Sequence, residues 1–120
     1  MNTKVTSLAL SKRLKELGIP QESEFYYNDG ELKMFSSFEY PPSGKEIHFT
    51  DGTWSNGTVY SAFLAEELGE ILKKVDFDIW YSYPDWRLKL SDDIETRGRD
   101  ESLINAMASM VIYLKEQNLI

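Results

Sequence analysis

The sequence predicts a single α+β domain in which an antiparallel sheet of about four to five strands, built from hairpins, packs with about three helices mainly on one face. Two hairpin signals, at residues 24–35 and 77–90, alternate with three amphipathic stretches. The chain has 120 residues, which is an ordinary size for one domain with one core. Its composition, 42% hydrophobic and 28% charged, is that of a folded globular protein.

The first expected helix covers residues 6–17, where leucines recur at helical spacing and charged side chains fall largely on the opposite side. Thr6 or Ser7 can cap its start. Gly18 can end it in the left-handed conformation that favours glycine. The leucines are Leu10, Leu14 and Leu17.

A hairpin follows over residues 24–35, because Asp29-Gly30 tolerates the positive φ angles of a two-residue turn. Closing this turn pairs Tyr27 with Leu32. Alternation along the two strands then predicts one half-buried face and one mixed face. The residues expected on the half-buried face are Phe25, Tyr27, Leu32 and Met34.

Residues 38–44 contain two prolines and a glycine, so they are expected to form an exposed connection. A short strand over residues 45–50 should place Ile47 and Phe49 on one side and His48 on the other. After a turn at Asp51-Gly52, Trp54 is expected beside Phe49.

A second helix is expected over residues 59–74, where six apolar residues form a stripe at helical spacing. Glu70 precedes Lys74 by four positions, the favourable order for a helical ion pair. Gly69 lowers helix propensity, so close packing of another element is expected there. The stripe consists of Tyr60, Leu64, Leu68, Ile71, Leu72 and Val75.

Residues 77–90 are expected to form a second hairpin with its turn at Pro84-Asp85, a register that faces Tyr81 with Leu88. Alternation gathers most of the apolar side chains on one face. Trp80 is the exception, since it falls on the polar face with Arg87 and Lys89. The apolar face consists of Phe77, Ile79, Tyr81, Tyr83, Trp86, Leu88 and Leu90.

The remaining residues predict a charged loop over 91–100 and a final helix over 101–117, capped by Asp100. The helix carries an apolar stripe, and the tail at 118–120 is expected to fold back and bury its two apolar residues. The stripe consists of Leu103, Met107, Met110, Val111 and Leu114, widened by Ile104 and Ala108.

Charge and composition restrict the function classes. The chain has 13 basic and 20 acidic residues and a net charge of −7, which disfavours direct binding to nucleic acids or anionic membranes. It has no cysteine, which excludes disulfides and thiolate chemistry. No apolar stretch is long enough for a signal peptide core or a membrane span, so a soluble, cytoplasmic protein is expected.

The chain resembles a family of small uncharacterised proteins of bacterial and bacteriophage or prophage genomes. The resemblance lies in scattered blocks of mainly core-forming pattern over most of the chain. It implies a possible phage-related role and no activity, cofactor or site residue. The blocks are Leu14-Lys15-Glu16-Leu17-Gly18, Phe25-Tyr26-Tyr27, residues 61–72 and residues 111–120.

No catalytic, metal-binding or cofactor-binding constellation is predicted. His48 is the only histidine, and a single strand histidine is more often structural than catalytic. The acidic clusters at residues 66–70 and 92–95 are expected on solvated faces. The glycines are isolated and form no phosphate-binding loop.

The sequence therefore favours a non-enzymatic protein-interaction protein whose partner is another protein or a second copy of the chain. A tryptophan flanked by cations is typical of a recognition surface, although a cation–π pair with Lys89 or burial under the 40–42 loop would also explain it. The candidate surface is Trp80, Arg87, Lys89, Tyr40, Pro41 and Pro42.

Two alternatives remain open. The first is a small-molecule-binding module with an aromatic pocket, in which Arg97 and Arg99 clamp a planar or anionic metabolite. The second is an enzyme, which would need His48 or Tyr113 to line a deep cleft beside a carboxylate.

Overall fold

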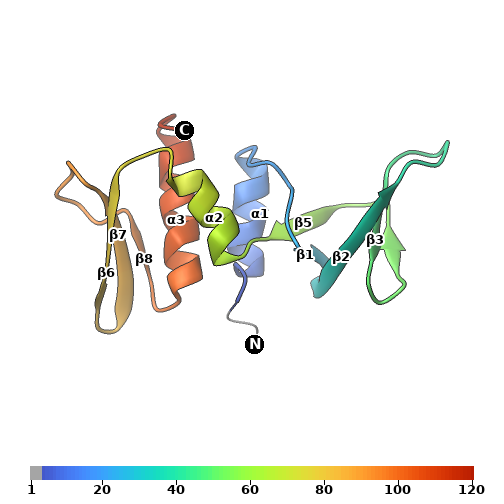
Figure 1. Cartoon of the computed structure of the whole chain (residues 1–120), viewed down its shortest axis with the longest axis horizontal. Coiled ribbons are helices and arrows are strands. Elements are labelled where there is room, and N and C mark those ends of the chain that lie inside the picture. Colours follow the sequence, from blue (N-terminus) through green and yellow to red (C-terminus); the bar gives the residue numbers. More distant parts are fainter. Residues whose placement is uncertain (1–3) are drawn as a thin grey trace.

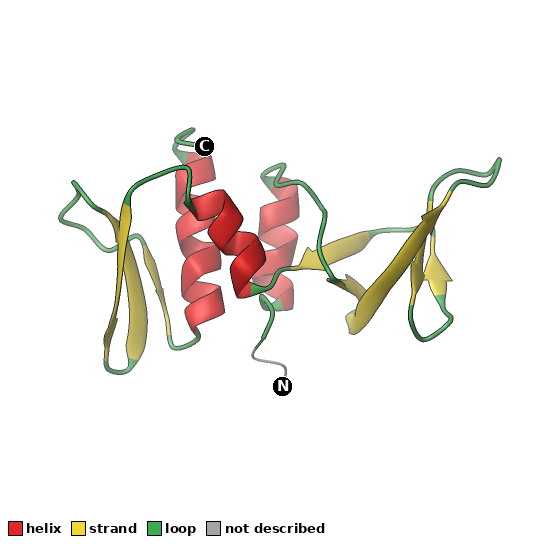
Figure 2. Cartoon of the chain, viewed as in Figure 1, coloured by secondary structure: helices red, strands yellow, loops and turns green. Residues whose placement is uncertain are grey.

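The computed structural model describes residues 4–120 and has three helices and eight strands in this range. The α+β class and the antiparallel pairing are confirmed, but the strands form two sheets, with orders β4-β3-β2-β1-β5 and β6-β7-β8. The three helices stand in the middle of the molecule and one sheet lies at each end (Figures 1 and 2). The molecule is accordingly elongated, with extents of 51 × 30 × 19 Å.

Helix α1 (Leu8–Glu16) confirms the first predicted helix. The hydroxyl oxygen of Ser7 accepts a hydrogen bond from the N–H of Leu10 at 3.3 Å, so Ser7 caps the first turn. Gly18 ends the helical segment with φ +84°, a conformation in which a β-carbon would be strained.

Strands β1 (Phe25–Asn28) and β2 (Glu31–Glu39) form the predicted hairpin in the predicted register, with Tyr27 opposite Leu32. The predicted half-buried face is correct for Phe25, Tyr27 and Leu32, which are partly buried, and wrong for Met34. Tyr26, on the opposite face, is the fully buried side chain, whereas Met34 is 47% exposed. The reason is that β2 extends beyond the hairpin and also pairs with β3. The aromatic side chains of this second pairing lie on the same face as Tyr26 and cover it.

Strand β2 continues to Glu39, so the predicted exposed connection begins later, at Tyr40. Strand β3 (Glu46–Phe49) confirms the short predicted strand, with Ile47 and Phe49 buried. The two-residue strand β4 (Trp54–Ser55) follows it. Trp54 lies opposite His48 and stacks on its ring at 6.1 Å, rather than pairing with Phe49 as predicted.

The predicted helix over residues 59–74 is wrong in its first part. Residues Val59–Ala62 form strand β5, which pairs with β1, and helix α2 covers only Ala65–Leu72. Valine and tyrosine suit a pleated strand, and β1 offers an unpaired edge, so sheet pairing overrides the helical spacing. The carboxylate of Glu67 accepts N–H bonds from Leu64 at 2.7 Å and from Glu24 at 3.0 Å, and ties the start of α2 to the segment before β1.

The predicted solvated face is confirmed for Glu66 and Glu70, which are exposed, whereas Glu67 is partly buried and burial raises the pKa of its carboxyl group. The ion pair expected between Glu70 and Lys74 is also absent from the described residues, because Glu70 pairs with Lys73 instead. The close packing predicted at Gly69 is wrong too, since a β-carbon there would meet no atom within 4 Å.

This open space gives a first prediction. Gly69→Ala should stabilise the chain by roughly 1 kcal/mol, because alanine removes backbone freedom from the unfolded chain and meets no steric obstacle in α2. Urea unfolding of the two chains measures the difference. A loss of stability would contradict the placement of this position on the open side of the helix.

Strands β6 (Phe77–Ser82) and β7 (Asp85–Leu90) form the second hairpin, but its register differs from the prediction. Tyr81 pairs with Trp86 and Ser82 with Asp85, so the turn is Tyr83-Pro84 and the pairing moves by two residues. Asp85 is held in the strand because its carboxylate accepts a hydrogen bond from Nε of Arg99 at 2.6 Å. A shift of two leaves every paired side chain on its predicted face.

The predicted charged loop ends in a strand, β8 (Gly98–Asp100), which adds to the edge of β7. Helix α3 (Leu103–Glu116) confirms the last predicted helix, although its cap is Ser102 rather than Asp100. Asp100 instead accepts the N–H of Ser102 at 2.8 Å. In the tail, Ile120 packs against the main core while Leu119 is about half exposed, so the predicted burial holds for one residue of the two.

The main core lies between the helices and the inner face of the three-stranded sheet. Leu88 on β7 is fully buried against it. A second, smaller cluster occupies one face of the five-stranded sheet and consists of Tyr26, Ile47 and Phe49, with Phe35, Phe38 and Val59 packed around them. The main cluster includes residues of all three helices, whereas the smaller cluster belongs to the five-stranded sheet.

Candidate interaction surface

Strand β6 is an open sheet edge. It is six residues long, it pairs only with β7 among the residues 4–120, and four of its six side chains are exposed. The other edges are short or contacted: β4 has two residues and β8 has three, and Lys15 of α1 donates to the carbonyl of Val59 on β5 at 2.8 Å. An edge of this length presents free backbone N–H and C=O groups to a partner strand.

An exposed apolar row runs along this edge. Ile79 is 43% exposed, Tyr81 is 51% exposed and Tyr83, in the turn, is 85% exposed. Ile79 and Tyr81 share the face of Leu88, but the helices cover Leu88 and leave the edge strand open. The ring of Tyr81 lies edge-on to Trp86 at 5.3 Å, which holds it in place.

The outer face of the same sheet carries a row of one aromatic and two cationic side chains. Trp80 lies opposite Arg87, and Arg87 lies opposite Arg99. Arg99 is paired with Asp85, but Arg87 has no ion pair with any carboxylate in the described chain, and its Nε is buried without a hydrogen-bond partner. An arginine beside a partly exposed tryptophan is a composition common in binding hot spots.

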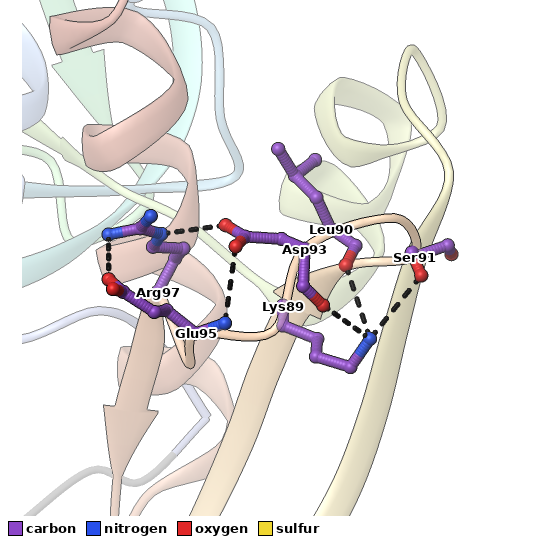
Figure 3. Close-up of polar contacts among 6 residues, drawn as sticks. All are labelled: Lys89, Leu90, Ser91, Asp93, Glu95 and Arg97. Carbon is purple, nitrogen blue, oxygen red and sulfur yellow. Dashed lines mark hydrogen bonds and ion pairs between the residues drawn. The ribbon is translucent and has the colours of Figure 1, made fainter.

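Lys89 shares this outer face, as predicted, but its ammonium group is occupied. It donates to the carbonyl oxygens of Asp93 at 2.9 Å and of Leu90 and Ser91 at 3.4 Å, and it pairs with Asp78 at 3.1 Å. Figure 3 shows these carbonyl groups converging on its Nζ atom. Lys89 therefore organises the loop after β7 and is a weak candidate for partner contact.

Arg97 completes the same loop. Its guanidinium binds Asp93 at 2.9 Å and Glu95 at 2.8 Å (Figure 3), and lies over the ring of Tyr113 at 4.7 Å. The hydrogen bond from Arg97 lowers the pKa of the Asp93 carboxyl group. Arg97 and Arg99 are both paired with carboxylates, so an anionic ligand would have to compete with these ion pairs, and the ligand clamp of this pair stays a prediction.

Tyr40, Pro41 and Pro42 lie in the connection between β2 and β3, at the far end of the five-stranded sheet. Figure 1 places this connection and strand β6 at opposite ends of the molecule. The predicted surface is therefore divided: Trp80, Arg87 and Lys89 share one face, and the proline loop neither joins nor covers it.

The residues considered for catalysis are engaged locally. Nε2 of His48 lies 3.1 Å from a carboxylate oxygen of Glu46, and its ring stacks on Trp54. Tyr113 lies beneath Arg97. Within residues 4–120, no three histidine, aspartate or glutamate side chains are grouped to share a metal ion. In the same range no helix has the length and apolar character required to cross a membrane.

The turn between β3 and β4 contains the most strongly shifted carboxyl group. The hydroxyl of Thr53 and the ammonium of Lys33 donate to Asp51 at 2.5 Å and 2.9 Å, and lower its pKa to about 2. This contribution to stability is present above the ordinary value of 3.8 and is lost as the pH falls through about 2.

We expect Thr53→Ala to raise the pKa of Asp51 toward 3.8, because it removes the hydrogen bond that lowers this pKa the most. Carbon NMR titration of the side-chain carboxyl groups measures this shift. Thr58→Ala, an exposed threonine outside the turn, serves as the control. An unchanged pKa in Thr53→Ala would show that the turn does not hold Asp51 in this way.

Sequence reasoning identified Trp80 and Arg87 but missed Ile79, Tyr81 and Tyr83, which were expected on a buried face. The alternation correctly placed Ile79 and Tyr81 on one face of a strand, whereas Tyr83 lies in the turn. The missing information was that β6 is an edge strand, since burial of a sheet face depends on what covers each strand and not on the alternation itself.

Comparisons of the chain with protein-family models, with curated proteins and with solved structures find no match.

Proposed function

We propose that this chain is a non-enzymatic protein-interaction protein that binds an extended segment of another protein along the edge of β6. The observation that carries the proposal is the exposed apolar row formed by Ile79 and Tyr81 on the six-residue open edge and by Tyr83 in the turn that follows it. Open edges are usually protected by lysine, proline or a covering segment. On β6 the only charged residue is Asp78, and it is paired with Lys89.

The partner segment is expected to be a strand with alternating apolar residues. Its backbone would extend the sheet by hydrogen bonds, and its apolar side chains would lie beside Ile79 and Tyr81. On the outer face it would pass Trp80, with the unpaired guanidinium of Arg87 behind it, so an acidic residue near this point should strengthen binding. A phage-related accessory role is part of the proposal and is motivated by the scattered pattern blocks at residues 14–18, 25–27, 61–72 and 111–120.

The test compares two variants with equal exposure of the original side chain. Tyr81→Lys places a charge in the middle of the apolar row, and Trp54→Lys places one on the five-stranded sheet, where the side chain is also 51% exposed. We expect Tyr81→Lys to capture at least tenfold less partner from host extracts, because an added strand would have to remove water from the lysine. Trp54→Lys should capture as much partner as the parent chain.

Both variants should keep the melting temperature within about 3 °C of the parent chain, since exposed substitutions usually cost little. Capture that is equal for the two variants would exclude the edge of β6 as the docking surface. If the parent chain self-associates and Tyr81→Lys abolishes this self-association, the bound segment is β6 of a second copy. The docking surface would then be retained, and the partner would be another copy of the chain.

A separate prediction concerns the outer face. Trp80→Ala should weaken partner capture about tenfold through loss of a large aromatic contact, with only a small change in stability. Titration calorimetry with the captured partner measures the affinity, and thermal unfolding measures the stability. A large fall in melting temperature with unchanged affinity would assign Trp80 to the fold instead.

A further inference from the structure

A groove of about 340 Å³ lies between helix α1 and the five-stranded sheet, away from β6. Its apolar floor belongs to the smaller core cluster, and the polar groups stand around it. This volume is at the lower end of the range of small-molecule sites. The apolar residues that line the groove are Tyr26, Phe38, Ile47 and Val59, and the others are Lys15, Gln21, Lys45 and residues 55–57.

The groove has a positive charge in an acidic protein. Its lining includes Lys15 and Lys45 and no aspartate or glutamate, although acidic residues outnumber basic ones by 20 to 13 in the whole chain. Neither lysine has an ion pair with a carboxylate in the described range 4–120. Nζ of Lys45 lies 3.9 Å from the ring centre of Phe38, and Nζ of Lys15 uses one donor on the carbonyl of Val59. An ammonium group has three donors, so both can still bind an anion.

The wall of the groove is held by hydrogen bonds. Gln21 accepts the N–H of Ser61 at 2.8 Å and donates to the carbonyl of Ile19 at 3.1 Å. The hydroxyl of Tyr26 donates to the carbonyl of Gln21 at 2.8 Å, and Tyr26 is itself 2% exposed. Groups that are already in place lose little freedom when a ligand binds.

We infer that this groove binds a small planar aromatic carboxylate. The ring would lie on the apolar floor near Phe38, and the carboxylate would bind the ammonium groups of Lys45 and Lys15. This arrangement combines an apolar contact area with a small number of polar groups that fix orientation, the usual composition of a ligand site. The site is independent of the docking surface on β6.

The test is an NMR titration of the isotope-labelled chain with naphthoate and with its uncharged analogue naphthamide. Naphthoate should cause saturable shifts at the amides of Gln21, Gly57 and Val59, and should bind roughly fivefold more tightly than naphthamide because of the charge-assisted hydrogen bonds. Lys45→Gln should reduce this difference by weakening naphthoate alone, and the double variant Lys15→Gln/Lys45→Gln should remove it.

Lys74→Gln is the matched control, since it makes the same change of charge at an exposed lysine outside the groove and should leave both affinities unchanged. Three results would overturn the inference: no saturable shift at the groove with about 1 mM naphthoate, equal binding of the charged and uncharged probes, or shifts that centre on Ile79 and Tyr81 of β6.

Discussion

Gly98→Ala is expected to destabilise the chain by about 3 kcal/mol, which would lower the melting temperature by roughly 12 °C. Gly98 lies on β8, which packs against helix α3. A β-carbon at this position would lie 2.4 Å from the carbonyl oxygen of Ala106 and 3.0 Å from Cβ of Met110. Both atoms belong to α3 and one is backbone, so the whole helix would have to move away from the sheet.

Urea unfolding of Gly98→Ala measures this loss, and Gly69→Ala is its control. The two variants add the same methyl group to a glycine, but the added carbon meets backbone in one and open space in the other. Opposite signs of the two changes in unfolding free energy are therefore expected. A Gly98→Ala chain with parental stability would show that β8 does not approach α3 so closely.

Leu88→Ala should cost about 3 to 4 kcal/mol of unfolding free energy, because it removes a fully buried side chain from the main core and leaves a cavity. Its cross-strand neighbour Ile79 provides the control, since the two residues pair directly and share one face. Ile79→Ala should cost less than about 1 kcal/mol, because Ile79 is already 43% exposed in the folded chain.

Urea unfolding of Leu88→Ala and Ile79→Ala measures both costs. Similar large losses in the two variants would mean that the edge of β6 is covered in solution, which would remove the basis of the docking surface. The comparison thus tests the fold and the availability of the apolar row together.

Local signals in the sequence predicted the elements whose contacts are close in the chain. Asp29-Gly30 specified the turn and the register of β1 and β2, and Ser7 and Gly18 marked the ends of α1. The stripe of α3 was recognised for the same reason, because its apolar residues recur within one helix.

The elements that were mispredicted depend on contacts between distant residues. Residues 59–62 have an apolar spacing that suits a helix, but pairing with β1 across thirty or more intervening positions makes them a strand. Gly98 looked like part of a charged loop, and only the approach of α3 explains why a glycine in a strand is useful there. The division into two sheets follows from the same long-range pairings.

For the interaction surface, the sequence identified an aromatic residue with cations around it but not which of them is free. The ammonium group of Lys89 is occupied by the loop after β7, while Arg87 has no partner in the described structure. Whether a cationic side chain has a partner depends on its neighbours in the folded structure, so residue type and alternation could not distinguish Arg87 from Lys89.

The most direct test of the docking surface is amide hydrogen exchange of the chain, free and in complex with its captured partner. We expect the amides of residues 77–82 to become strongly protected in the complex, because an added strand would supply hydrogen bonds to the open edge of β6. Unchanged exchange over 77–82, with protection confined to the five-stranded sheet or the proline loop, would contradict the account.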